Sequence, residues 1–176
     1  KRIIERIAQK QARSDIRSEK KSDGVYDVII VGAGPAGLSA SLASIMHHLS
    51  YMMLDQQEAG GTIRQYPRQK LVMTEPVEIP LYGWLKKSEY TKEILVDIWE
   101  KIIEKFGLTM HIGEKVQTVV RENGRFKIVT SVGEYQARNV VLAMGRRGMP
   151  RKLGIPGEEM AKVVYQLIDA QDYTNK

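Results

Sequence analysis

The pattern of apolar and polar positions predicts alternating strands and helices over the first third of the chain. Residues 26–31 form a β-branched apolar run that is typical of a buried parallel strand, and residues 50–54 form a second one. Between them, residues 38–49 are rich in Ala, Ser and Leu, which favours a helix. This strand–helix–strand order is typical of an α/β fold with a parallel sheet.

A second helix and strand are predicted after a long irregular segment. Residues 63–87 show no clear helical pattern and contain several prolines, which predicts a loop. Apolar residues then recur at helical spacing over 94–106, with Ser88 as the expected N-cap and Gly107 as the expected end. The apolar run at 108–112 predicts a third parallel strand.

The alternation changes to an antiparallel pattern in the last third. Residues 116–121 and 125–131 alternate around a hairpin turn at 122–124, and a short strand at 135–137 continues the meander. Residues 139–145 form another buried strand that ends in glycine. The predicted fold is therefore α/β: a Rossmann-like parallel sheet with helices on its faces and an inserted antiparallel three-stranded β-meander.

The turn after the first strand carries the strongest chemical signal. It reads Gly32-Ala33-Gly34-Pro35-Ala36-Gly37 and leads directly into the helix. In a dinucleotide site, the first glycine allows a tight turn, the second leaves room for a pyrophosphate, and the third lets the helix pack closely on the strand. The free N–H groups of the helix attract phosphate, and proline fits there because its missing N–H would lack a partner anyway.

An acidic residue follows the second strand at the distance that this motif requires. Asp55 lies 21 residues beyond Gly34, where a carboxylate accepts hydrogen bonds from a ribose diol. An acid rather than an arginine at this place disfavours a 2′-phosphate. The motif therefore predicts either NAD or the ADP half of FAD, and the glycines alone do not separate these two ligands. A tight turn without a ligand is the alternative.

The amino-acid composition argues against several other classes of function. The chain has 176 residues, of which 43% are hydrophobic, and no cysteine, so we expect one domain without disulfides or thiol chemistry. No apolar run approaches the roughly 18 residues of a membrane span. The three histidines give little support to a metal site, and His111 is expected to be structural. We expect a cytoplasmic protein.

Most of the net charge of +6 lies at the N-terminus. Residues 1–24 carry a net charge of +4 and are expected to form a basic tail or linker, with a helix through about Arg13. A patch for nucleic acid or an anionic membrane is the alternative. No aromatic residue interleaves the basic ones, so base stacking has no platform and nucleic-acid binding is not expected.

With these motifs in place, residues 26–165 resemble the FAD-binding domain of flavoproteins with two dinucleotide-binding domains. These are the pyridine nucleotide-disulfide oxidoreductases, and the thioredoxin-reductase-like branch is the most similar. The resemblance implies FAD as cofactor and NAD(P)H as electron donor of a full-length oxidoreductase. It further implies a protein or small-molecule electron acceptor, and it allows a homodimer.

The resemblance also implies a set of cofactor contacts. The glycine run would hold the FAD pyrophosphate, and Asp55 with Gln56 would hold the adenosine ribose. Gly60-Gly61 would lie near the flavin, and Val116 would contact adenine through its backbone. The family's Ala-Thr-Gly motif has Met144 in place of Thr. The expected contacts are Gly32, Gly34, Pro35, Ala36, Gly37, Asp55, Gln56, Gly60, Gly61, Thr62, Val116, Ala143, Met144 and Gly145.

Two parts of the family pattern are missing from the sequence. The family inserts a second GxGxxG/A domain for NAD(P)H and then returns to the flavin domain with a Gly-Asp motif. We therefore expect residues 25–176 to be the N-terminal portion of the FAD-binding domain. No pair of titratable residues forms a convincing acid–base constellation, so no catalytic residue is assigned. Arg64, Tyr66 and Arg68 are the candidates for flavin-side contacts.

Three other functions fit parts of the pattern. The first is a flavin monooxygenase or a ferredoxin-type reductase on the same scaffold. The second is a non-catalytic module that senses FAD or NAD and signals through the basic tail. The third is an NAD-only dehydrogenase, which the meander disfavours because further βα units would be expected instead. A yellow protein with a flavin spectrum would distinguish the flavin-dependent functions from an NAD-only dehydrogenase.

Overall fold

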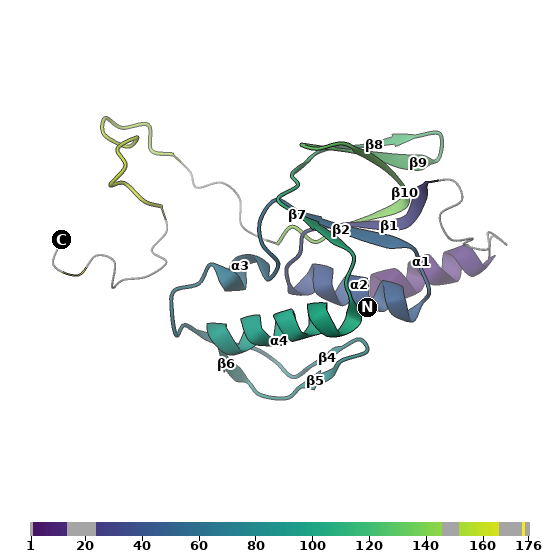
Figure 1. Ribbon diagram of the computed structural model, residues 1–176, viewed down its shortest axis with the longest axis horizontal. Helices are drawn as coiled ribbons and strands as arrows, with labels where there is room; N and C mark the ends of the chain where they lie inside the picture. The colour runs from purple at the N-terminus through teal and green to yellow at the C-terminus, as the bar shows by residue number, and fades with distance from the viewer. Residues whose placement is uncertain (1, 14–23, 146–151, 166–173, 175–176) are drawn as a thin grey trace.

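The computed structural model describes residues 2–13, 24–145, 152–165 and 174. Its elements alternate as the apolar pattern predicts, and Figure 1 shows them in chain order. They are α1 (Arg2–Arg13), β1 (Val25–Val31), α2 (Pro35–Met46), β2 (Tyr51–Asp55), α3 (Gly61–Arg64), β3 (Leu71–Met73), β4 (Val77–Ile79), β5 (Gly83–Leu85), β6 (Glu89–Thr91), α4 (Lys92–Phe106), β7 (Met110–Ile112), β8 (Val116–Glu122), β9 (Arg125–Thr130) and β10 (Glu134–Leu142).

One six-stranded sheet organises the fold, with strand order β7-β2-β1-β10-β9-β8. The first four strands run parallel, and β9 runs antiparallel to both of its neighbours, β10 and β8. The sequence predicted two separate strands at 135–137 and 139–145, but β10 is continuous. Its first residues pair with β9, and residues 136–142 pair with β1. The α/β fold class is thus confirmed, and the meander is part of the main sheet.

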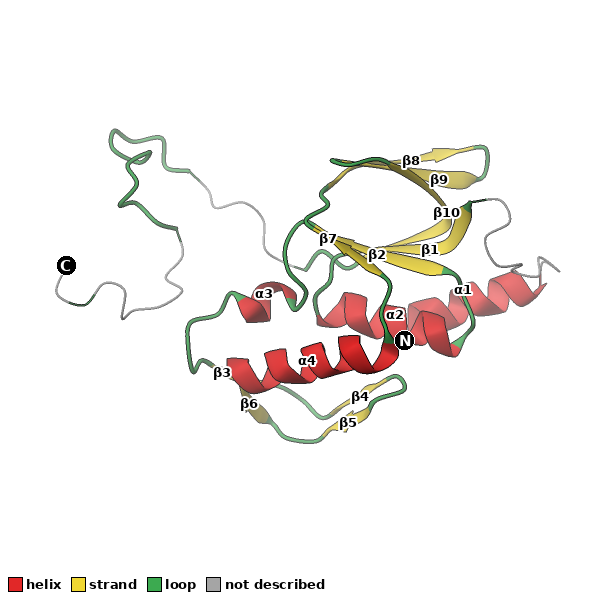
Figure 2. Ribbon diagram, in the orientation of Figure 1, coloured by secondary structure: helices red, strands yellow, loops and turns green. Residues whose placement is uncertain are grey.

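The two faces of the sheet are covered by different elements. In β1, Val28 and Ile30 point to one face and pack with α1, α2 and α4, whereas Ile29 and Val31 point to the other face. There they pack with apolar residues of β8, β9 and β10. Figure 2 shows the helices beneath the sheet and the β8–β9 hairpin curling over its upper side. The hairpin thus covers the face on which the sequence suggested further helices.

The N-terminal segment is part of the fold over residues 2–13. The sequence predicted a solvated tail containing a helix, and the helix is present as α1. However, α1 contacts α2, and Ile4 is only 1% exposed within the main core, with Ile7 and Ala8 packed beside it. These three residues lie on one side of the helix, which is buried, whereas Ile3 and the described basic side chains face solvent. The rest of the predicted linker, 14–23, lies outside the described residues.

The segment between α3 and α4 is more regular than the sequence predicted. Instead of a loop, it forms two small antiparallel sheets, β3 with β6 and β4 with β5. The expectation that Ser88 caps α4 is wrong: Ser88 precedes β6, and the hydroxyl of Thr91 accepts from the N–H of Ile94 at 3.4 Å. Gly107 ends α4 in the left-handed conformation, as predicted.

A buried carboxylate joins the three central strands at the end opposite the glycine turn. Asp27 is 1% exposed, and its Oδ2 accepts from the backbone N–H and the hydroxyl of Ser50, both at 2.8 Å. Its Oδ1 accepts from the guanidinium of Arg138 at 3.1 Å. Asp27 lies in β1, and its partners come from β10 and from the residue before β2, so it fixes the register of the parallel strands.

The part of the chain that the structure describes contains neither a membrane-spanning helix nor a metal-binding cluster. No helix there is long and apolar enough to cross a membrane. No cluster of three or more His, Asp or Glu side chains in these residues is arranged to hold a metal ion.

Candidate functional site

The turn between β1 and α2 requires glycine at two positions because the backbone packs tightly there. Gly32 has a φ of 112°, and a Cβ on it would lie 2.4 Å from the carbonyl oxygen of Ala143. A Cβ on Gly37 would lie 1.8 Å from the carbonyl oxygen of Gly32. No larger residue fits at either place without moving the backbone. The first and third glycines thus allow the tight turn and the close helix packing that their spacing predicts.

The second glycine differs because packing does not require it. Gly34 has a φ of −79°, which any residue can adopt. A Cβ there would meet no described atom closer than the Cα of Gly61, at 3.9 Å. Gly34 lies on the wall of a cavity, so its missing side chain leaves part of that cavity open.

The N-terminus of α2 offers free hydrogen-bond donors to this cavity. No described side chain caps it, its first turn contains no acidic residue, and Pro35 takes the first helical position. The N–H of Leu38 already donates to the carbonyl of Gly34 at 2.9 Å, but the N–H groups before it have no acceptor within the helix. Because the helix dipole places about half a positive charge there, this end suits an anion such as phosphate.

Asp55 ends β2 beside the same turn and is held by two backbone donors. Its Oδ2 accepts from the N–H of Ala33 at 2.6 Å, and its Oδ1 accepts from the N–H of Gln57 at 2.8 Å. The carboxylate is thereby fixed in direction. Each oxygen retains a second lone pair, so the group can still accept from a pair of hydroxyls. The sequence predicted the position of Asp55 but not its bond to the glycine turn.

The Gly-Gly pair at the start of α3 packs against the glycine turn. The N–H of Gly60 donates to the carbonyl of Ala33 at 2.9 Å, and Gly60 has a φ of 108°. A Cβ on Gly61 would lie 3.0 Å from the Cα of Gly34. Gly61 also has a positive φ, of 57°, so the positive φ at both positions and the close approach of Gly61 to the turn explain the Gly-Gly pair in the sequence.

These segments enclose one cavity of about 510 Å³. All expected cofactor contacts line it except Gly37, which lies behind the turn, and Gly60, which bonds to the turn. The structure thus brings together residues from the ends of β1, β2 and β10 and from the start of β8. The lining residues are Val31, Gly32, Gly34, Pro35, Ala36, Leu54, Asp55, Gln56, Gly61, Thr62, Ile63, Glu114, Lys115, Val116, Ala143, Met144 and Gly145.

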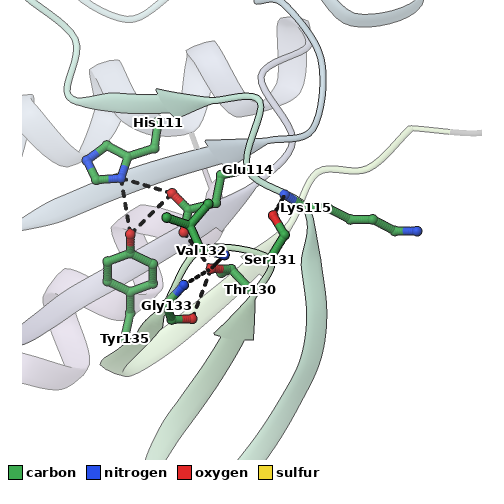
Figure 3. Close-up of polar contacts among 8 residues, drawn as sticks. All are labelled: His111, Glu114, Lys115, Thr130, Ser131, Val132, Gly133 and Tyr135. Carbon is green, nitrogen blue, oxygen red and sulfur yellow. Dashed lines mark hydrogen bonds and ion pairs between the residues drawn. The ribbon is translucent and has the colours of Figure 1, made fainter.

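Sequence reasoning missed Glu114, a buried carboxylate on the cavity wall. It is 4% exposed and accepts from the hydroxyls of Thr130, at 2.5 Å, and Tyr135, at 3.2 Å (Figure 3). His111 Nδ1 lies 3.1 Å from the same carboxylate. Burial alone raises the pKa of Glu114, but the hydrogen bonds from these side chains outweigh it and leave the pKa below its usual value. No sequence signal marks this glutamate, because its partners lie up to 21 residues away.

The three candidates for flavin-side contacts lie outside the cavity. Arg64 Nε donates to the carbonyl of Ala59 at 2.7 Å, and its guanidinium lies 2.6 Å from Glu100 on α4. Arg64 and Arg68 line a different depression, between α3 and α4. Tyr66 instead lies under the ammonium group of Lys70, which is 5.5 Å from the ring centre. The structure therefore does not support this part of the expected site.

Comparison with known proteins agrees with this geometry. A ferredoxin–NADP reductase from Thermus thermophilus is 35% identical over 135 residues, which are 75% of this chain and 38% of that protein. One from Lactococcus lactis subsp. cremoris is 30% identical over 156 residues, or 85% of this chain and 46% of that protein. The chain thus spans less than half the length of these relatives.

Solved structures and the family comparison point the same way. A thioredoxin reductase from T. acidophilum superposes with a TM-score of 0.57 at 27% identity, over 77% of this chain and 40% of that one. A bacillithiol disulfide reductase from Staphylococcus aureus shares the fold, with a TM-score of 0.71 at 22% identity, over 84% of this chain and 47% of that one. Residues 29–176 match the family described as pyridine nucleotide-disulphide oxidoreductase. The chain belongs to the pyridine nucleotide-disulphide oxidoreductase family.

Proposed function

We propose that this chain is the FAD-binding portion of an NAD(P)H-dependent flavoprotein oxidoreductase, similar to thioredoxin reductases. The observation that carries the proposal is Gly34, which the packing does not require and which lies where the uncapped N-terminus of α2 opens into the cavity. A glycine required by the fold is either closely packed, as Gly37 is, or has a positive φ, as Gly107 has, and neither applies to Gly34. Gly34 instead keeps space free beside phosphate-binding N–H groups.

The residues around the cavity fit the ADP half of FAD. The first turn of α2 would bind the pyrophosphate through its N–H groups, and Asp55 would accept from the ribose hydroxyls. The start of β8 at Val116 would lie against the adenine ring, and Gln56 would lie beside the ribose. The segment at 143–145 forms a further part of the cavity wall, and Met144 takes the place of the family's threonine.

The protein's part in the reaction is to hold and orient the cofactor. When bound, FAD supplies the redox chemistry, taking electrons from NAD(P)H and passing them to an acceptor. The cavity residues supply fixed donors, a fixed carboxylate and walls that exclude water. The relatives named above support a small-protein or disulfide acceptor. A homodimer and a cytoplasmic location belong to the same proposal.

The test is direct binding of FAD to the purified chain. We expect a yellow protein whose flavin absorbance is released on denaturation, and a rise in melting temperature when FAD is added. At 100 times the dissociation constant, ligand binding adds about 2.7 kcal/mol to the stability. A colourless protein that is stabilised by NAD but not by FAD would overturn the proposal, because the cavity would then belong to a different dinucleotide.

A further inference from the structure

The Glu114 carboxylate lies on the wall of the cavity, yet none of the proposed cofactor contacts uses it. Its two oxygens are occupied: one accepts from Thr130, and the other faces Tyr135 and His111 (Figure 3). Burying a carboxylate costs free energy unless hydrogen bonds compensate for the lost water. Because both oxygens are engaged with protein groups and the residue is only 4% exposed, Glu114 acts on a ligand through its neighbours, unlike the half-buried Asp55.

Hydrogen bonding around Thr130 shows how firmly Glu114 is held. The hydroxyl oxygen of Thr130 accepts from the N–H groups of Val132 at 3.2 Å and Gly133 at 3.0 Å. A hydroxyl has one proton, and two acceptors lie within reach of it: Glu114 Oε1 at 2.5 Å and the carbonyl oxygen of Gly133 at 2.9 Å. The shorter distance and the negative charge favour donation to Glu114. The carbonyl of Gly133 in turn accepts from the N–H of Thr130 at 2.9 Å. The turn between β9 and β10 is therefore organised around Thr130, whose hydroxyl also bonds to the carboxylate of Glu114.

Glu114 also joins the other walls of the cavity. Its backbone N–H donates to the carbonyl of Asp55 at 2.9 Å. The next residue, Lys115, donates its N–H to the hydroxyl of Ser131 at 3.1 Å and accepts from the N–H of Ser131 at 2.9 Å. The end of β2, the start of β8 and the β9–β10 turn thus meet at Glu114, and the first two of these segments line the cavity.

We propose that Glu114 is a positioning residue for the purine-nucleotide end of the cavity. Through Thr130 and Tyr135, it holds the edge at Lys115 and Val116 at the distance from Asp55 that an adenosine diphosphate requires. The proposal rests on the proposed function, because it assumes that this cavity binds the ADP half of a dinucleotide. The proposal predicts that loss of the Glu114 carboxylate weakens the binding of ADP alone by the same factor as the binding of FAD.

The test compares two matched pairs of variants of the full chain, with dissociation constants for FAD and ADP. Glu114→Gln keeps the size but replaces one acceptor oxygen with an NH₂ group, so a hydroxyl that now donates must turn away. Glu134→Gln is its control, because Glu134 is an exposed partner of Lys127 at the start of β10. Thr130→Val removes the hydroxyl, and Thr130→Ser restores it.

We expect Glu114→Gln and Thr130→Val to weaken FAD and ADP binding by the same factor, about tenfold, as for the loss of one hydrogen bond to a charged group. Glu134→Gln and Thr130→Ser should bind as the unchanged chain does. If the two disruptive variants lose melting temperature but bind both ligands normally, Glu114 is merely structural and the inference is overturned. If Glu114→Gln does not fold, the comparison of Thr130→Val with Thr130→Ser decides whether the inference holds. If the unchanged chain binds neither ligand, the proposed function itself fails.

Discussion

Replacing Gly34 with alanine should separate cofactor binding from folding. The φ of −79° and ψ of −175° at Gly34 are allowed for alanine, and the added Cβ meets no described atom within 3.4 Å. Alanine at a compatible position stabilises a protein by about 0.4–1 kcal/mol, since it restricts the unfolded chain. We therefore expect a melting temperature equal to or about 1–4 °C above that of the unchanged chain.

The same methyl group should nevertheless weaken FAD binding. It projects into the cavity beside the N–H groups of the first turn of α2, where the pyrophosphate would lie. Losing one hydrogen bond to a charged group costs about 1.5–3 kcal/mol, which corresponds to about 10- to 150-fold in the dissociation constant. Fluorescence titration of FAD and a thermal melt without ligand measure the two effects on one sample.

Gly37→Ala is the matched comparison, because its Cβ would lie 1.8 Å from the carbonyl oxygen of Gly32. Overpacking of this kind costs about 1–3 kcal/mol or more, so this variant should lose stability even without ligand. If Gly34→Ala binds FAD within twofold of the unchanged chain while folded, the cavity beside Gly34 does not hold the pyrophosphate. The reasoning would then be refuted.

Three further predictions concern stability. Asp27→Ala removes the buried acceptor of Arg138 and of the N–H and hydroxyl of Ser50, and should lower the free energy of unfolding in urea by about 3–5 kcal/mol. Ile4→Ala should cost about 2–5 kcal/mol because α1 is packed, whereas a solvated tail would show no change in the same experiment. The pKa of Glu114 is lower in the folded state than in the unfolded state, where it is about 4.3. Its ionised form therefore stabilises the fold fully above the unfolded pKa. This stabilisation is lost as the pH falls through the lower pKa of the folded state. The stability difference between the unchanged chain and Glu114→Gln should therefore shrink in acid denaturation below about pH 4; a constant difference would contradict it.

The glycine turn and Asp55 could be predicted because their geometry is local. A strand that ends in glycine, a helix that starts at proline and an acid after the next strand fix the relative positions of these groups over about 20 residues. The lining of the cavity by 143–145 was also predicted, though only from the family resemblance. Local spacing alone does not say that β10 ends beside β1.

The rest depends on contacts between distant segments. Glu114, Thr130 and Tyr135 are unremarkable in the sequence, and they form a cluster only after β7, β9 and β10 have come together. The burial of α1 was missed for a similar reason, since its apolar stripe predicts a helix but not the helix against which it packs. Ser88 and Thr91 are both good N-caps, and the pairing of β6 with β3 decides between them.

The position of β10 between β1 and β9 sets an order of events during protein synthesis. Asp27 in β1 and Arg138 in β10 are 111 residues apart in the sequence, yet they lie side by side in the sheet. A ribosome adds about 5–20 residues per second, so about 5–20 s pass between the synthesis of β1 and the synthesis of β10. During this time one edge of β1 is open, and exposed strand edges can pair with other chains. Of the segments that line the cavity, 143–145 is synthesised last, so the cavity cannot close before the strands of the main sheet have been made.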